Sequence, residues 1–214
     1  MLQRRLEVFA VQVRNLGKGR IGTAVSLRDI PNKYKHLPII GRGATSIILD
    51  EGNDKVIILT RDSMKQQYLT NALDGKWLDA YDAPHSHPDI RDMPIHIIEM
   101  PKLDKLSKVN YKKVQNLIRQ YSAAWLATYV HSEPEAEQKR REILQGYASE
   151  DNEDHPLYHV ARHLLNYDDK QYQFDLSPQN FMQDKAGNIV AADPMVDKDL
   201  LRALRKQKPI GRQW

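Results

Sequence analysis

The segment 172–197 constrains this chain more than any other, because it combines polar side chains and turn signals at fixed spacing (YQFDLSPQNFMQDKAGNIVAADPMVD). Pro178 lacks a backbone donor and disfavours a helical residue before it, so Asp175 and Asn180 are expected on a loop. A hairpin turn with the sequence KAGN and a short apolar strand then lead to Asp193. The hairpin is therefore expected to bring the three polar side chains together.

Two carboxylates and one amide oxygen form a set of ligands suited to a hard cation such as Mg²⁺. Phosphoryl transfer asks a protein mainly for positioning and charge neutralisation, which such a set supplies. The alternative is an ordinary hairpin rich in Asp and Asn. The spacing DxxxxN alone is common, whereas DxxxxN followed by an apolar pair, a turn and an apolar strand that ends in Asp is much rarer. We therefore favour a phosphate site.

A second segment, 38–48 (PIIGRGATSII), supports this interpretation. Gly41 and Gly43 stand two apart, and the small Ser46 takes the place of a third glycine between two apolar stretches. Glycines at such a turn let backbone N–H groups approach phosphates. Alone, this pattern is more often an ordinary turn. It lies about 130 residues before the acidic loop, which is where a kinase-like fold would place the turn that covers the nucleotide phosphates.

Together, these motifs resemble the protein-kinase-like superfamily, and most closely the early serine/threonine kinases of short-tailed bacteriophages. That group also lacks the usual His-Arg pair before the catalytic Asp, as here, where Gln173 and Phe174 precede Asp175. It also replaces the Asp-Phe-Gly start of the metal loop by Asp-Pro, as at Asp193 and Pro194. The resemblance covers roughly residues 33–197 in the order of elements, and 174–194 is its specific part.

The resemblance implies an α+β, two-lobed, protein-kinase-like fold. Residues 1–101 would form a small lobe with an antiparallel sheet, residues 102–200 a reduced helical large lobe, and residues 201–214 a basic tail. It implies ATP and Mg²⁺ as cofactors. Asp175 would orient the substrate hydroxyl, and Asn180 and Asp193 would hold the metal.

The activity implied is serine/threonine phosphorylation of a protein, by a viral enzyme that acts on host proteins in the host cytoplasm. The strand 95–100 (IHIIEM) resembles the last strand of the small lobe and the hinge that binds adenine through its backbone. The nucleotide-binding residues expected from the resemblance are Gly41, Arg42, Gly43, Ser46, Lys55, Glu99 and Met100.

One departure from the family concerns the lysine that grips the nucleotide phosphates, because Ile58 stands at its expected place in the strand KVIILT. Lys55 and Arg61 each lie three residues away, so strand alternation points them to the opposite face unless a bulge intervenes. Arg42 in the glycine turn could instead reach the phosphates. The helix expected over 63–73, which normally supplies a Glu partner, contains no acidic residue. The alternative to an enzyme is therefore an inactive pseudokinase that binds a host or partner protein.

The 214 residues are 41% hydrophobic and 28% charged, which suits one domain or a two-lobed one. With no cysteine, disulfides, thiolate zinc sites and a cysteine nucleophile are excluded, and a cytoplasmic protein without a signal peptide or membrane span is expected. The net charge of +4 lies largely in the basic tail, which could contact nucleic acid or an acidic partner but is also an ordinary solvated tail.

The remaining elements follow from periodicity and turn signals. His159 and His163 stand four apart on an expected helix, and we favour packing or solvent exposure over a zinc site because no nearby carboxylate completes a metalloprotease signature. The expected strands are 37–40, 45–50, 55–60 and 95–100, and the expected helices are 2–16, 63–73, 110–130 and 155–165. Within 133–153, a solvated helix followed by an acidic loop is expected.

Overall fold

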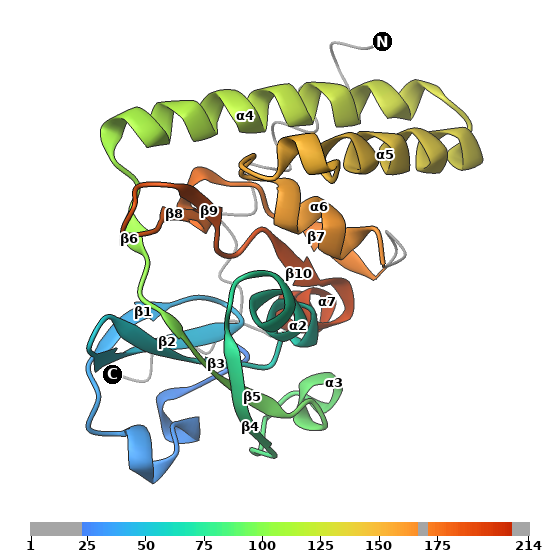
Figure 1. The fold of residues 1–214 in the computed structure, drawn as a ribbon. Coiled ribbons are helices and arrows are strands. Elements are labelled where there is room, and N and C mark those ends of the chain that lie inside the picture. The colour runs from blue at the N-terminus through green and yellow to red at the C-terminus, as the bar shows by residue number, and fades with distance from the viewer. Residues whose placement is uncertain (1–22, 167–170, 207–214) are drawn as a thin grey trace.

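A computed structural model describes residues 23–166 and 171–206, so the helix expected over 2–16 lies outside the described residues. The chain forms an α+β structure, which confirms the expected class. A five-stranded antiparallel sheet occupies one part of the molecule and helices α4, α5 and α6 the other (Figure 1). Four short strands, β7 to β10, lie between them.

The sheet has the strand order β1-β2-β3-β5-β4. Its strands are β1 (Ile39–Arg42), β2 (Ser46–Gly52), β3 (Lys55–Thr60), β4 (Lys76–Tyr81) and β5 (Ile95–Pro101). Turn residues 52–54 join β2 to β3, and Gly52, Asn53 and Asp54 all have positive φ. Strand β4 was not predicted. It is an edge strand with the sequence KWLDAY, in which no residue is buried and the apolar residues do not alternate with polar ones.

The helix α2 (Ser63–Ala72) connects β3 to β4 and confirms the prediction to within one residue. The Asp62 side chain caps it by accepting a hydrogen bond from the Lys65 backbone N–H at 3.0 Å. The other helices are α3 (Pro88–Arg91), α4 (Lys108–Ala127), α5 (Glu133–Tyr147), α6 (Tyr158–Leu164) and α7 (Lys198–Lys206), and the short 3₁₀ turns are η1 (Leu27–Asp29), η2 (Asn32–Tyr34), η3 (Thr128–Val130), η4 (Glu150–Asn152) and η5 (Pro178–Asn180).

After Pro101 the chain leaves the large sheet. Its next strand, β6 (Asp104–Lys105), pairs with β8 (Phe181–Gln183), which in turn pairs with β9 (Ile189–Ala191). The hairpin expected around residues 185–188 is therefore present, with Gly187 at positive φ in its turn. A separate antiparallel pair joins β7 (Tyr172–Phe174) to β10 (Met195–Asp197).

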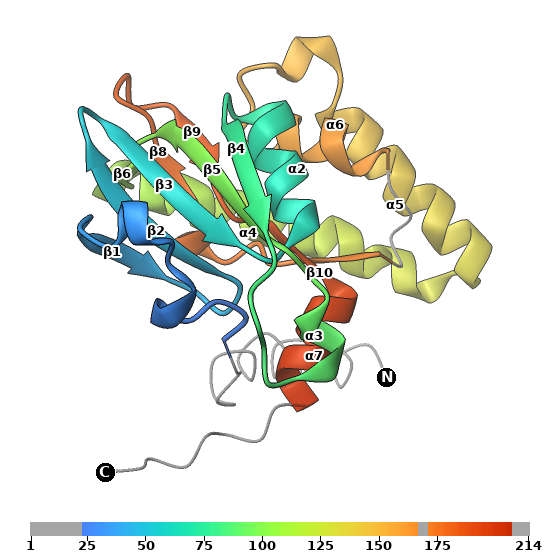
Figure 2. The same ribbon diagram turned by 90° about the horizontal axis from the view of Figure 1, so that it is seen from below.

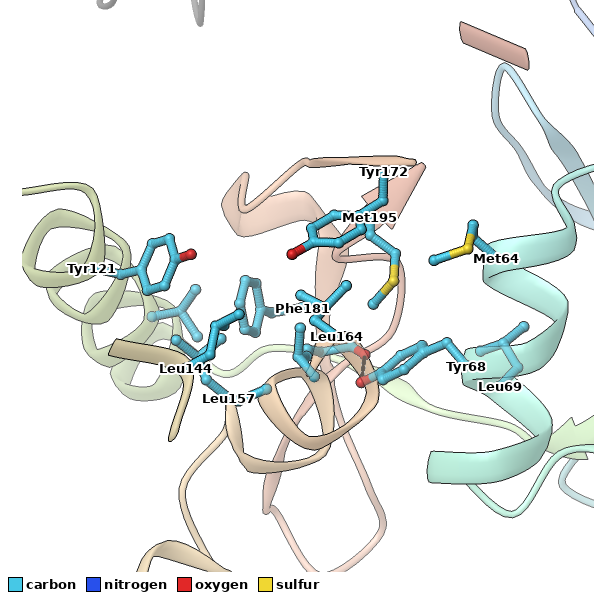
Figure 3. Close-up of a cluster of buried hydrophobic side chains, with 14 of the residues drawn as sticks. Met64, Tyr68, Leu69, Tyr121, Leu144, Leu157, Leu164, Tyr172, Phe181 and Met195 are labelled. Carbon is cyan, nitrogen blue, oxygen red and sulfur yellow. Dashed lines mark hydrogen bonds between the residues drawn. The ribbon is translucent and has the colours of Figure 1, made fainter. Parts of the chain in front are cut away.

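The two faces of the sheet have different cores. On the inner face, Val56 and Ile58 of β3 belong to a core cluster that also contains residues of α2, of α6 and of β8. Figure 3 shows part of this cluster, with Tyr68 of α2, Leu164 of α6 and Phe181 of β8. On the outer face, strand alternation places a separate cluster, which the N-terminal segment covers. The outer cluster contains Val25, Ile30, Ile47, Leu49, Ile57, Leu59, Ala83, Ile95 and Ile97.

The helix α7 returns to the sheet side of the molecule. Its buried residues Leu200, Ala203 and Leu204 pack with Ala24 and Ile90, and Figure 2 shows α7 beside α3. The basic tail expected from residue 201 thus begins inside a packed helix. Within the described residues, no helix combines the length and apolar character that a membrane crossing requires.

Candidate active site

The pairing of β7 with β10 brings the predicted catalytic and metal segments to one place. Phe174 lies opposite Met195, so Asp175 follows one strand at the point where Pro194 precedes the other. The backbone N–H of Asp175 donates to the Pro194 carbonyl at 2.9 Å. Residues 175 and 193, far apart along the hairpin, therefore meet at the same end of a short ribbon.

Asn180 joins these two segments. Its backbone carbonyl accepts hydrogen bonds from the N–H groups of Ala192 at 2.8 Å and Asp193 at 3.1 Å. Its side-chain Nδ2 donates to the Asp175 backbone carbonyl at 2.6 Å. With the amide nitrogen occupied in this way, the amide oxygen is the atom left to act as a ligand. The structure therefore brings together the three residues predicted from the DxxxxN pattern and the later Asp.

The Asp175 side chain is exposed at the surface, yet the protein around it is dense enough to shift its titration. Burial raises the pKa of the Asp175 carboxyl, the hydrogen bond with Asn180 lowers it, and the nearby negative charge of Asp193 raises it again. The net direction is upward. A carboxylate that is more basic than usual suits a group that accepts a hydrogen bond or a proton from a hydroxyl.

A positively charged side chain at the site, that of Lys65, comes from α2. The Lys65 Nζ lies 2.8 Å from Asp193 Oδ2 and donates to Ser46 Oγ at 2.9 Å. The Lys65 side chain is only 5% exposed, whereas that of Asp193 is 40% exposed. Lys65 is not among the site residues predicted from the sequence. The available signal was its helical spacing, because Lys65 shares a face with the apolar residues Tyr68 and Leu69, where a charged residue is unusual.

The predicted alternatives lie elsewhere. The side chain of Lys55 is on the outer face of the sheet and forms an ion pair with Glu99 at 2.7 Å. The guanidinium of Arg61 is buried and donates to the backbone carbonyls of Ala24 and Ala83. Arg42 is exposed on edge strand β1. Ile58, which stands where the resemblance leads us to expect a lysine, is buried in the inner core.

The predicted glycine turn is present between β1 and β2. The Gly43 N–H donates to the Ser46 carbonyl at 2.9 Å, which closes the turn. A Cβ at Gly41 would lie 3.1 Å from the end of the Ile48 side chain, so a larger residue here would push that side chain aside by a few tenths of an ångström. Ser46 is buried, and its hydroxyl connects the turn to Lys65. Lys65 therefore contacts both this turn, through Ser46, and Asp193.

The helix α2 is fixed to residues 191–197 at three points, spaced three residues apart on the helix. Asp62 Oδ2 accepts the Asp197 N–H at 3.3 Å, Lys65 contacts Asp193, and the Tyr68 hydroxyl donates to the Ala191 carbonyl at 2.8 Å. Figure 3 shows Tyr68 projecting from α2 into the inner core. The Asp62 side chain is fully buried, and this burial raises its pKa to about 6.

Two further predicted residues lie at the end of β5. Met100 is buried in the inner core, and Glu99 faces the outer side, toward Lys55. A hollow of about 460 Å³ also lies on the outer side, between the N-terminal segment and β4. Its walls include Arg28, Tyr81 and Ile97, and none of the residues around Asp193. This hollow is therefore separate from the candidate active site.

The residues at the site fit a hard cation. Asp193 offers a carboxylate exposed enough for a metal to keep bound water, and Asn180 offers an amide oxygen. Within residues 23–166 and 171–206, no three His, Cys, Asp or Glu side chains form a metal cluster. One carboxylate and one amide are nevertheless an adequate protein contribution for Mg²⁺ that arrives with substrate phosphates.

Comparisons of the chain with protein-family models, with curated proteins and with solved structures found no match. A functional assignment must therefore depend on the chemistry of the site itself.

Proposed function

We propose that the chain is a protein-kinase-like phosphotransferase that uses ATP and Mg²⁺ to phosphorylate a hydroxyl group of a protein. The observation that carries the proposal is the joining of Asp175, Asn180 and Asp193 through the β7–β10 pair and the Asn180 hydrogen bonds. A sheet with one helix between its third and fourth strands, followed by a helical part, supports a two-lobed architecture of this kind.

Each residue has a distinct role in the proposed reaction. Asp175 accepts the hydrogen bond of the attacking hydroxyl and takes its proton as the new O–P bond forms and the bond to the leaving diphosphate breaks. Asn180 and Asp193 hold Mg²⁺, which when bound neutralises charge on the phosphates. The turn from Gly41 to Ser46 offers backbone N–H groups to the nucleotide.

A nucleotide titration tests the proposal. Mg²⁺-ATP should raise the melting temperature of the purified protein, and radiolabelled phosphate should pass to the protein itself or to a bacterial lysate. Asp175→Asn should keep the Mg²⁺-ATP shift but lower transfer at least 100-fold, because it removes the proton acceptor while preserving shape. Transfer that is equal with and without this change would falsify the role of Asp175.

The second candidate is a pseudokinase that acts by binding a protein partner. Ile58 favours it, because an apolar side chain is buried where the family places a lysine. No shift of the melting temperature at millimolar Mg²⁺-ATP, together with no transfer, would favour this candidate over the enzyme.

A further inference from the structure

Lys65 connects three parts of the candidate site that are distant in sequence. It projects from α2, donates to Ser46 of the glycine turn, and contacts Asp193, which lies 128 residues further along the chain. Its side chain is almost fully buried, and a buried ammonium group requires a charged or polar partner. The carboxylate of Asp193 is that charged partner.

The same carboxylate is the proposed ligand for Mg²⁺. An ammonium group 2.8 Å from Asp193 Oδ2 already neutralises this carboxylate, and it would repel a divalent cation that arrives alone. Nucleotide phosphates would change this balance. They bring enough negative charge to accept Lys65 and to bind the metal, so that both cations are accommodated together.

We propose that Lys65 is the resident cation of the Asp193 site: it occupies the place of the metal while nucleotide is absent, and it moves to the phosphate oxygens when Mg²⁺-nucleotide enters. The phosphate part of this inference rests on the proposed function. The resident-cation part rests on the ion pair itself. Lys65 would thereby bind the nucleotide phosphates, as a lysine on β3 would do if Ile58 did not stand at that position.

The helix α2 makes this exchange local. Asp62 and Tyr68, three residues before and after Lys65, bind Asp197 and Ala191 on either side of Asp193. The backbone of α2 is thus held against residues 191–197, and the exchange requires only that the ammonium group at the end of the Lys65 side chain change partners. Only the ammonium group and the bound ions need to move.

Binding of Mn²⁺, a spectroscopic substitute for Mg²⁺, provides the test. Electron paramagnetic resonance would give the Mn²⁺ affinity of the wild type, Lys65→Met, Lys65→Arg and Lys55→Met, and calorimetry the affinity for Mg²⁺ with a non-hydrolysable ATP analogue. Lys65→Met should bind Mn²⁺ alone at least 10-fold more tightly, and the Mg²⁺-nucleotide at least 10-fold more weakly. Lys65→Arg should stay closer to the wild type, because it keeps the charge.

Lys55→Met is the matched control, since Lys55 has an ion pair of similar length on the other face of the sheet. It should leave both affinities unchanged. Shifts of both affinities in the same direction, or no shift in Lys65→Met, would overturn the proposal. If the wild type binds no nucleotide, the proposed function fails, and the Mn²⁺ measurement still decides whether Lys65 is the resident cation.

A second measurement needs no variant and guards against misfolding of Lys65→Met. The complex of the wild type with the ATP analogue should bind Mn²⁺ at least 10-fold more tightly than the free analogue does. Independent binding of the metal and the analogue would contradict the exchange.

Discussion

Two lysine–carboxylate pairs of nearly equal length lie on opposite faces of the same sheet. Lys65 contacts Asp193 at 2.8 Å beside the inner face, and Lys55 contacts Glu99 at 2.7 Å on the outer face. Their surroundings differ, because the Lys65 side chain is 5% exposed and that of Lys55 is 51% exposed. The distance alone does not indicate which pair matters. Burial makes the inner pair costly to break, and water screens the outer one.

The largest expected effect is a pH dependence of the free energy of unfolding, caused by Asp62 on the inner side of the sheet. The folded-state pKa of Asp62 is about 6, against an ordinary value of 3.8, so the folded protein binds this proton more tightly than the unfolded chain does. The stabilising contribution is complete below pH 4 and is lost as the pH rises through 6. The free energy of unfolding should fall by about 3 kcal/mol over this range relative to Asp62→Asn, measured by urea denaturation.

The outer pair should show the opposite sign. The hydrogen bond from Lys55 lowers the pKa of Glu99, so its contribution is present above the ordinary value of 4.5 and is lost on acidification. The wild type should lose only a little more free energy of unfolding on acidification than Glu99→Gln does. A pH profile of Asp62→Asn that matches the wild type would contradict the assignment of the inner effect to Asp62.

Next in size is the cost of breaking each pair at neutral pH. Asp193→Asn leaves the buried Lys65 ammonium without its carboxylate, and the free energy of unfolding should fall by about 2 kcal/mol. This is less than for a fully buried pair, because Asp193 is partly exposed. Glu99→Gln should lower the free energy of unfolding by much less in the same denaturation experiment, because water screens this exposed pair. Equal losses in the two variants would mean that burial does not distinguish the pairs.

The smallest effect concerns two tyrosines that each donate to a backbone carbonyl. Tyr68 donates to Ala191 beside the inner face, and Tyr81 donates to Asp29 on the outer side. Tyr68→Phe leaves a buried carbonyl without its donor and should cost about 1–2 kcal/mol of unfolding free energy. Tyr81→Phe should cost less, because Tyr81 is only partly buried and water can replace its hydroxyl. The reverse order in thermal denaturation would contradict the comparison.

Local signals were enough for much of the fold. Apolar, β-branched runs bounded by turn signals predicted β2, β3 and β5, and the helical stripe around Val114, Leu117 and Tyr121 predicted α4. Strand β4 was not predicted, because this edge strand buries none of its residues and shows no alternation of apolar and polar residues. The helix expected within 133–153, ahead of an acidic loop, is α5, which ends at Tyr147. A 3₁₀ turn takes up residues 150–152 of the acidic stretch.

The sequence by itself determined the candidate Asp175, Asn180 and Asp193 cluster, because a proline-bounded loop and a hairpin turn are short-range features that bring these residues together. It also determined that Lys55 and Ile58 lie on opposite faces of β3, because side chains alternate along a strand. Only the tertiary structure decided which cation meets Asp193. That choice depends on how α2 packs against residues 191–197, through contacts at 62, 65 and 68 that join positions more than 120 residues apart. No local pattern specifies such a contact, because it is set by the burial of the inner core as a whole.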